Sequence, residues 1–288
     1  MRGEAAREQV GAMLMLLRYR GEAADEMAGL VEAARDHVGL PWRFSAPVDL
    51  DWPSYADGRT RGLPWYLLAA LLLARADLSV VMHGPLAGPG RQALAQALDL
   101  LAIPRCATQP AAEAALAASG FAFLPLETLS PDLAELLALR GVLGLRSPLN
   151  TVGRLLDPSG AAGSIDGVFH PAYIALHLAT ASLFGRRVTV LKGGGGEAEW
   201  SGVKPLSVHT GTGETIWPPV EGAGKPDSRS ATDLVEVWHG TRTDPAAEAI
   251  VIATAAVAMH AAGRETDPAS CLVRARRLWD RRLEGSGA

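Results

Sequence analysis

The sequence is poor in the residues that build disulfide frameworks, metal sites and membrane spans. Its 288 residues include only two cysteines, Cys106 and Cys271, which lie far apart without the spacing of a metal site. We therefore expect a reducing compartment and no structural disulfide. The longest apolar run, LPWYLLAALLLA at 63–74, is too short to cross a bilayer, so it predicts a core helix and no membrane partner.

The chain also lacks an excess of positive charge and an apolar leader. Its net charge is −4 and its isoelectric point is near 6.0, which excludes a global basic field, although a local basic patch is compatible with it. The first ten residues, MRGEAAREQV, contain no apolar segment, so we expect no signal peptide and a cytoplasmic location. With 48% hydrophobic and 20% charged residues, the chain can bury a core.

Hydrophobic patterning predicts helices at the N-terminus and an α/β arrangement after it. Residues 4–37 predict two helices separated by Gly21. Residues 39–58 hold three prolines and predict a crossing segment between two domains. Beyond this segment, helices alternate with short apolar strands, which favours a mostly parallel sheet; the expected strands are 78–82, 120–126 and 186–192.

The second half of the chain predicts mainly helices. Ser130 followed by Pro131 is typical of a helix start, and Asn150 is a candidate N-cap for the segment TVGRLL. Residues 205–240, rich in Gly, Pro and Thr, are expected to be irregular. Two closing helices are expected at 244–262 and 266–283.

Two segments together resemble a known enzyme family. Residues 11–35 resemble the opening helix pair of anthranilate phosphoribosyltransferases, and 121–161 follow the family pattern F-x-F-A-P, V-R and L-G-x-R-T-x-F-N-x-L-G-P-L-x-N-P. Residues 50–84 further resemble the YbiB-like branch of this family, glycosyltransferase family 3. The positions retained in the long pattern are Phe121, Phe123, Pro125, Arg140, Leu143, Gly144, Arg146, Asn150, Gly153, Leu155 and Pro158.

The resemblance implies an α/β fold of the nucleoside-phosphorylase type, with a small N-terminal helical domain and a larger α/β domain around a mostly parallel central sheet. It implies a helical domain at 1–48 to which 129–157 contributes, and an α/β domain formed by 49–128 and 158–288. It also implies a homodimer through the helical domain.

In this family, three motifs surround a diphosphate and Mg²⁺. The G-T-G-G-D loop under the phosphates corresponds here to SYADGRT at 54–60, which keeps one glycine. The K-H-G-N-R motif corresponds to MHGPL at 82–86, which keeps His83 and Gly84 but loses the lysine. The metal motif H-G-x-D-G-L-D-E falls on 192–199, where Ala198 replaces an aspartate and Glu199 is the remaining candidate metal ligand.

The resemblance and the positive charge of the region predict a phosphate or ligand site without a confident catalytic residue. Mg²⁺ is expected only if transferase activity is retained. Each candidate also has a structural interpretation, such as a packed His83, an Arg146 that caps a helix or pairs with an acid, or a solvated Glu199. The candidate residues are His83, Gly84, Arg146, Asn150, Arg154, Lys192, Gly193 and Gly196.

A second basic feature lies near the C-terminus, in RARRLWDRR at 274–282. Arg274, Arg277 and Arg281 share one helix face, which predicts contacts with the phosphates of DNA or RNA. The alternative is a solvated face of an amphipathic helix.

Three functions are therefore compatible with the sequence. The first is a homodimer related to anthranilate phosphoribosyltransferase that lacks tryptophan-pathway activity and binds nucleic acid or another polyanion. The second is an active phosphoribosyl or glycosyl transferase with a changed acceptor. The third is a purely structural or regulatory dimer.

Overall fold

The computed structural model describes residues 3–56, 62–88 and 90–284. The single glycine retained in SYADGRT, Gly58, and the neighbouring Asp57 lie outside the described residues.

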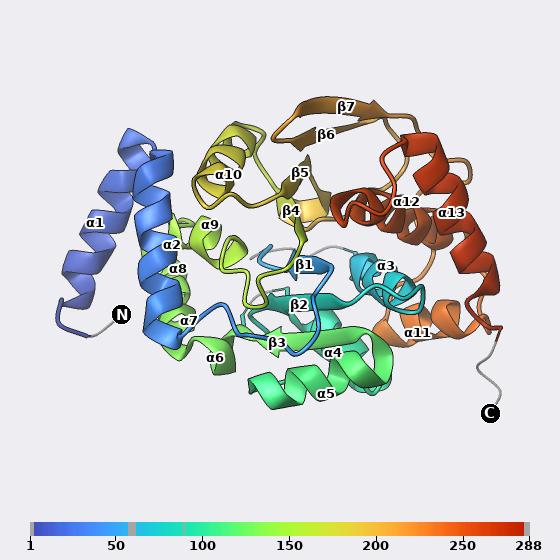
Figure 1. Cartoon of the computed structure of the whole chain (residues 1–288), viewed down its shortest axis with the longest axis horizontal. Helices are drawn as coiled ribbons and strands as arrows, with labels where there is room; N and C mark the ends of the chain where they lie inside the picture. Colours follow the sequence, from blue (N-terminus) through green and yellow to red (C-terminus); the bar gives the residue numbers. More distant parts are fainter. Residues whose placement is uncertain (1–2, 57–61, 89, 285–288) are drawn as a thin grey trace.

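A seven-stranded sheet forms the centre of the molecule (Figure 1), in the order β3-β2-β1-β4-β5-β6-β7. The first five strands in this order are parallel, and the last two form an antiparallel hairpin at one edge. The prediction of a mostly parallel α/β sheet is confirmed. The strands are β1 (Leu50–Pro53), β2 (Val80–Gly84), β3 (Phe121–Pro125), β4 (Gly163–Val168), β5 (Val188–Lys192), β6 (Leu206–Thr210) and β7 (Gly213–Trp217).

The helices at the N-terminus lie at one end of the molecule, to the left in Figure 1. The two helices predicted before residue 38 are confirmed as α1 (Arg7–Arg20) and α2 (Ala24–Val38). Three later short helices join them, α7 (Pro131–Ala138), α8 (Arg140–Leu143) and α9 (Leu149–Arg154). The division of the chain into two domains stays a prediction.

The remaining helices cover the two faces of the sheet. Because side chains alternate across a strand, Val80 and Met82 point to one apolar core and Val81 to the other. The first core is covered by α3 (Trp65–Ala74), α4 (Gln92–Leu100), α11 (Ala231–His239), α12 (Pro245–Ala261) and α13 (Pro268–Arg281). The second core is covered by α5 (Gln109–Ser119), α6 (Leu126–Leu129), α10 (Ala172–Leu183) and the N-terminal helices.

The most apolar segments are the most deeply buried helices. The run predicted as a core helix is α3, in which nine of ten residues are buried, and it packs against α12. Helix α12 is apolar on all sides and rich in alanine, so it can lie between α3, α13 and the sheet. None of the described helices is both long and apolar enough to cross a membrane.

Several local predictions were wrong. The expected crossing segment contains β1, a central strand, and the segment expected to be irregular contains β6, β7 and α11. The predicted helix start is confirmed, because Ser130 is the N-cap of α7 and Pro131 is its first residue, but the Ser130 hydroxyl accepts no capping hydrogen bond. Asn150 is not an N-cap. It lies inside α9, which begins at Leu149 with Pro148 as its N-cap.

Candidate functional site

The chain changes direction across the sheet between β1 and β4, so the two strands form a topological switch point. Open α/β sheets bind ligands at the carboxyl ends of strands beside such a point, where the loops diverge. At this edge β1 leads into Ser54, β2 ends at Gly84 and β5 leads into Gly193. The motifs aligned with the family's diphosphate and metal sites therefore lie at one edge of the sheet.

The glycine loop after β5 is tightly folded. A Cβ atom on Gly193 would lie 1.6 Å from the carbonyl oxygen of Glu197, and Gly195 has a φ of 68°. The N–H groups of Gly193, Gly194 and Gly196 donate to the carbonyls of Val168, Glu199 and Gly193, respectively. These three N–H donors are thus already used. The phosphate site predicted at Gly193, Gly196 and the exposed Lys192 stays a prediction, and it requires the loop to open.

The loop directs a carboxylate into the edge of the sheet. Glu197 is buried, and its Oε1 accepts hydrogen bonds from Ser54 Oγ at 3.1 Å and from the Ala56 N–H at 3.0 Å. The guanidinium of Arg91 lies 3.1 Å from the same oxygen and is also buried. The protein's own acid thus takes the donors of the segment aligned with the family's phosphate loop. The sequence analysis did not single out Glu197, although the family pattern has leucine at this position and an acid there is unusual.

The candidate metal ligand is also engaged by the protein. Glu199 was interpreted, taken alone, as solvated, but it is buried, and its Oε2 accepts a hydrogen bond from the Tyr66 N–H at 3.1 Å. Among residues 3–56, 62–88 and 90–284, no group of three or more His, Cys, Asp or Glu side chains is arranged to hold a metal ion. With Glu197 paired to Arg91, the described oxygen donors at this edge do not form a site that fits Mg²⁺.

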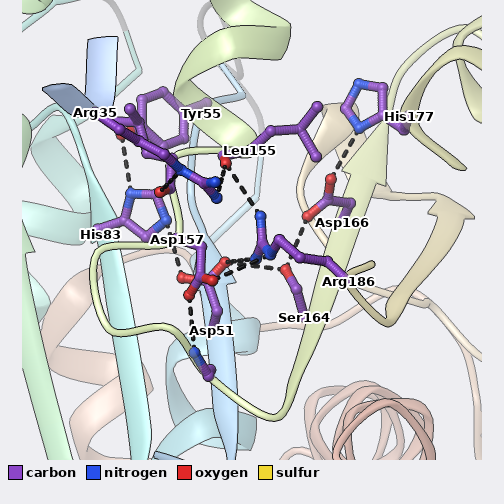
Figure 2. Close-up of polar contacts among 12 residues, drawn as sticks. Arg35, Asp51, Tyr55, His83, Leu155, Asp157, Ser164, Asp166, His177 and Arg186 are labelled. Atoms are coloured by element: carbon purple, nitrogen blue, oxygen red, sulfur yellow. Dashed lines mark hydrogen bonds and ion pairs between the residues drawn. The ribbon is translucent and has the colours of Figure 1, made fainter. Parts of the chain in front are cut away.

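A buried polar network crosses the sheet below this edge (Figure 2). Tyr55 Oη lies 3.0 Å from His83 Nδ1, and His83 Nε2 lies 3.1 Å from Asp51 Oδ1 at an angle outside hydrogen-bond geometry. Ser164 Oγ donates to Asp51 at 3.0 Å and lies 3.2 Å from Asp166, which contacts His177. His83 is therefore a packed residue of the core. Gly84 is also structural, because a Cβ there would lie 2.1 Å from the Ser54 carbonyl oxygen.

Burial and neighbouring charges shift the pKa values of the acidic groups in this network. Burial alone would raise the pKa of Asp51, but His83, Arg186 and Ser164 together hold that pKa below its ordinary value. Burial raises the pKa of Asp157 despite its contact with Arg186 Nε at 3.0 Å. Burial and the Asp51 charge raise the pKa of Tyr55, so this phenol stays protonated.

Beside the network, a cavity of about 260 Å³ opens between the N-terminal helices and the carboxyl end of β4. Among the described residues that line it, four are arginines and none is an acid, although the whole chain is acidic. The arginine-lined cavity is formed by Arg18, Arg140, Gly144, Leu145, Arg146, Ser147, Asn150, Thr151, Arg154, Val168, Phe169, His170, Tyr173 and His177.

Arg154 is held rigidly at the inner wall of this cavity. It is buried and donates to the backbone carbonyls of Gly167 at 3.0 Å, Asn150 at 2.9 Å and Gly196 at 3.2 Å. Burial, which disfavours the charged form, lowers the pKa of Arg154 to about 10. Nearer the opening, the guanidinium of Arg146 lies 5.6 Å from the centre of the Phe169 ring.

The structure thus brings together three of the predicted ligand residues, Arg146, Asn150 and Arg154. His83, Gly84 and Lys192 do not line the cavity. Sequence reasoning missed Arg18, His170, Tyr173 and His177, whose spacing carried no signal, and it recorded Arg140 as a retained family position without assigning it a role.

The predicted nucleic-acid residues lie elsewhere. Arg274, Arg277 and Arg281 are exposed on α13. The neighbouring Arg282 contacts Arg75 at the C-terminal end of α3, whereas Tyr66, which contacts Glu199, lies at the other end of α3. The C-terminal end of α13 and the buried Glu199 therefore lie at opposite ends of α3.

Comparisons with known proteins define the class of the chain. A family model described as "Glycosyl transferase family, helical bundle domain" matches residues 1–38. The chain belongs to the anthranilate phosphoribosyltransferase family of glycosyltransferases.

Individual relatives agree with this assignment. An anthranilate phosphoribosyltransferase of Anaeromyxobacter sp. (strain Fw109-5) is 29% identical over 92% of this chain and 82% of its own length. The uncharacterized protein YbiB of Escherichia coli is 30% identical over 68% of this chain and 62% of its own length. The crystal structure of anthranilate phosphoribosyltransferase from Thermus thermophilus superposes with a TM-score of 0.83 at 25% identity, over 98% of this chain and 88% of that one.

Proposed function

We propose that this protein is a member of the family that does not carry out Mg²⁺-dependent phosphoribosyl transfer and that binds a small oxyanion in the arginine-lined cavity. The Glu197 carboxylate carries the first half of this proposal. Glu197 accepts a hydrogen bond from the Ala56 N–H and forms an ion pair with Arg91. Ala56 belongs to the segment that aligns with the family's diphosphate-binding loop. A diphosphate entering there would meet a buried negative charge and no free donors from Gly193 or Gly196.

The charge of the cavity supports the second half. Arg18, Arg140, Arg146 and Arg154 converge from four different segments, and none of the described lining residues is an acid. Guanidinium groups present paired N–H donors that match carboxylate and phosphate oxygens. The volume of about 260 Å³ suits a small molecule, and Phe169 and Tyr173 supply apolar surface for a ring or chain.

The test combines an activity assay with ligand titration. With phosphoribosyl diphosphate, anthranilate and Mg²⁺, we expect no turnover at ordinary enzymatic rates of about 1–10³ s⁻¹. Titration with benzoate or sulfate should show saturable binding that Arg146→Gln weakens about tenfold or more, because a charge-assisted hydrogen bond is lost. Arg105→Gln, at an exposed ion pair far from the cavity, is the control. Ordinary turnover would favour the active-transferase alternative, and absent binding would reject the cavity as a site.

Nucleic-acid binding through Arg274, Arg277 and Arg281 is a second proposal, supported by three exposed cations on one helix face. The same titration includes an oligonucleotide at low and high salt. Binding that falls steeply with salt and disappears in the triple alanine variant would support a polyanion function for α13. Binding that is unchanged in that variant would reject it.

We further propose a homodimer through α1 and α2. The supporting observation is exposed apolar surface on α1, where Met13 is 46%, Leu16 68% and Tyr19 93% exposed. Light scattering at micromolar concentration should return about twice the 30.2 kDa of one chain. Leu16→Glu should shift the mass toward one chain, whereas Val273→Glu, at an exposed apolar position of α13, should not. A single-chain mass for the unmodified protein would reject the dimer.

A further inference from the structure

Arg154 connects the arginine-lined cavity to the glycine loop at 193–199. Its side chain lines the cavity, and its Nη2 also donates to the carbonyl oxygen of Gly196 at 3.2 Å. Its other two nitrogens donate to backbone carbonyls of α9 and β4, which fixes the guanidinium in place. The residue after Gly196 is Glu197, whose carboxylate fills the edge of the sheet. One guanidinium therefore contacts both the cavity and the loop that carries the internal acid.

The buried end of the closed loop is imperfectly paired. Glu197 accepts hydrogen bonds through Oε1, whereas its Oε2 is buried without a hydrogen-bond partner among the described residues. Arg91 contacts the same Oε1 through Nη1, and its Nη2 is likewise buried without a described partner. At the surface end of the loop, Gly194 and Gly195 are exposed. Because burying an unpaired polar atom costs free energy, these two atoms oppose the closed position of the loop.

The Glu197 carboxylate and an oxyanion in the cavity would draw on the same cation. Burial lowers the pKa of Arg154 to about 10, and the charge of Glu197 is the largest effect that opposes this shift. The closed loop is therefore stabilised by attraction between Glu197 and Arg154. An oxyanion beside Arg154 would offset that charge and repel Glu197. It would also compete with the neutral Gly196 carbonyl, because a charged acceptor forms the stronger hydrogen bond.

We propose that Arg154 holds the glycine loop closed and that a small oxyanion bound in the arginine-lined cavity releases the loop. Glu197 is then an autoinhibitory contact, because its carboxylate covers the donors of Ser54 and Ala56 only while the loop is closed. The inference rests on the proposed function and adds to it a positioning residue and a movement of the loop. Since binding and closure oppose each other, an opened loop must in turn raise the affinity of the cavity for the oxyanion.

Amide hydrogen exchange of the segment 191–200 measures release of the loop. The full chain is labelled with and without saturating benzoate. Exchange in this segment should accelerate about tenfold or more in benzoate, because a hydrogen bond from a charged donor is lost. A bound ligand ordinarily slows exchange by stabilising the folded state, so acceleration confined to this segment reports opening of the loop.

Substitution of Arg154 tests its role as the positioning residue. Arg154→Lys keeps the positive charge but lacks the planar fork that reaches three carbonyls. This variant should therefore exchange rapidly at 191–200 without benzoate and change little when benzoate is added. Arg282→Lys is the matched control, because Arg282 also donates to three backbone carbonyls, in α11 and α13, and should leave exchange at 191–200 unchanged.

A second variant opens the loop without changing a residue of the cavity. A Cβ atom on Gly193 would lie 1.6 Å from the carbonyl oxygen of Glu197, so Gly193→Ala excludes the closed loop. In calorimetric titration it should bind benzoate about tenfold more tightly than wild type, an effect that a loss of stability alone does not produce. Gly211→Ala is the control, since Gly211 is an exposed turn glycine whose added Cβ would meet no described atom within 4 Å.

The failure of this inference and the failure of the proposed function give different results. If benzoate binds without accelerating exchange at 191–200, if Arg154→Lys exchanges there as slowly as wild type, or if Gly193→Ala gains no affinity, Arg154 does not couple the cavity to the loop. The inference is then wrong and the proposed function stands. If wild-type protein does not bind benzoate, the proposed function fails and this inference fails with it.

Discussion

Replacing Glu197 with alanine is expected to lower the free energy of unfolding by about 3–5 kcal/mol, because it leaves the buried Arg91 without its counter-charge. The same substitution removes the acceptor of the hydrogen bonds that the Ala56 N–H and the Ser54 hydroxyl donate. These donors and Arg91 form an anion site once the internal acid is gone. Inorganic phosphate should therefore restore part of the loss, by about 2.7 kcal/mol at a hundredfold excess over its dissociation constant.

Denaturant unfolding with and without phosphate measures both effects. Wild-type protein gains only the stabilisation that the arginine-lined cavity provides, so the additional gain in Glu197→Ala reports the vacated site. Glu197→Gln is the matched control, since its amide oxygen can still accept from Ala56 while the charge is absent. A variant that loses stability without an additional phosphate response would show that the segment at 54–56 is no anion site.

Replacing Asp51 with alanine is expected to be similarly destabilising, by about 3–5 kcal/mol. Its Oδ2 accepts from Ser164 at 3.0 Å and lies 3.4 Å from Arg186 Nη2, and its Oδ1 lies 3.1 Å from His83 Nε2. All four groups are buried or nearly so, so water cannot replace the carboxylate. Because the free energy of unfolding of a native protein is only about 5–15 kcal/mol, this loss would remove much of the protein's stability.

The control for Asp51→Ala is Asp99→Ala, which removes an exposed ion pair with Arg105 and should cost about 0–1 kcal/mol. The pKa of Asp51 is lowered in the folded state, so its contribution is present above the ordinary value of 3.8 and is lost as pH falls through the folded value. The difference between wild type and Asp51→Ala should therefore shrink in acid. Equal stabilities for the two alanine variants near neutral pH would contradict this account of the network.

The pattern of apolar residues by itself determined much of the fold. The helices α1, α2, α3 and α12 and the strands β2, β3 and β5 follow from local hydrophobic runs and periodicity, because such segments must bury their apolar faces wherever they lie. The retained motif at 121–161 placed the chain in its family. Strand β1 escaped detection because LDWP is only four residues long and contains a proline, so nothing local distinguishes it from a loop.

The chemistry of the site was decided by the tertiary structure. Glu197 meets Ser54 and Arg91 across 143 and 106 residues of sequence, and His177 faces its acid only because α10 packs beside β4. Four arginines line one cavity, and they come from α1, α8, α9 and the segment between α8 and α9. No sequence motif links Arg18 to Arg154. Hydrogen bonds and ion pairs act over a few ångströms in space, whereas sequence patterns report neighbours along the chain. The apolar pattern could therefore specify which segments are buried, but only the packed sheet and helices could determine which charges meet.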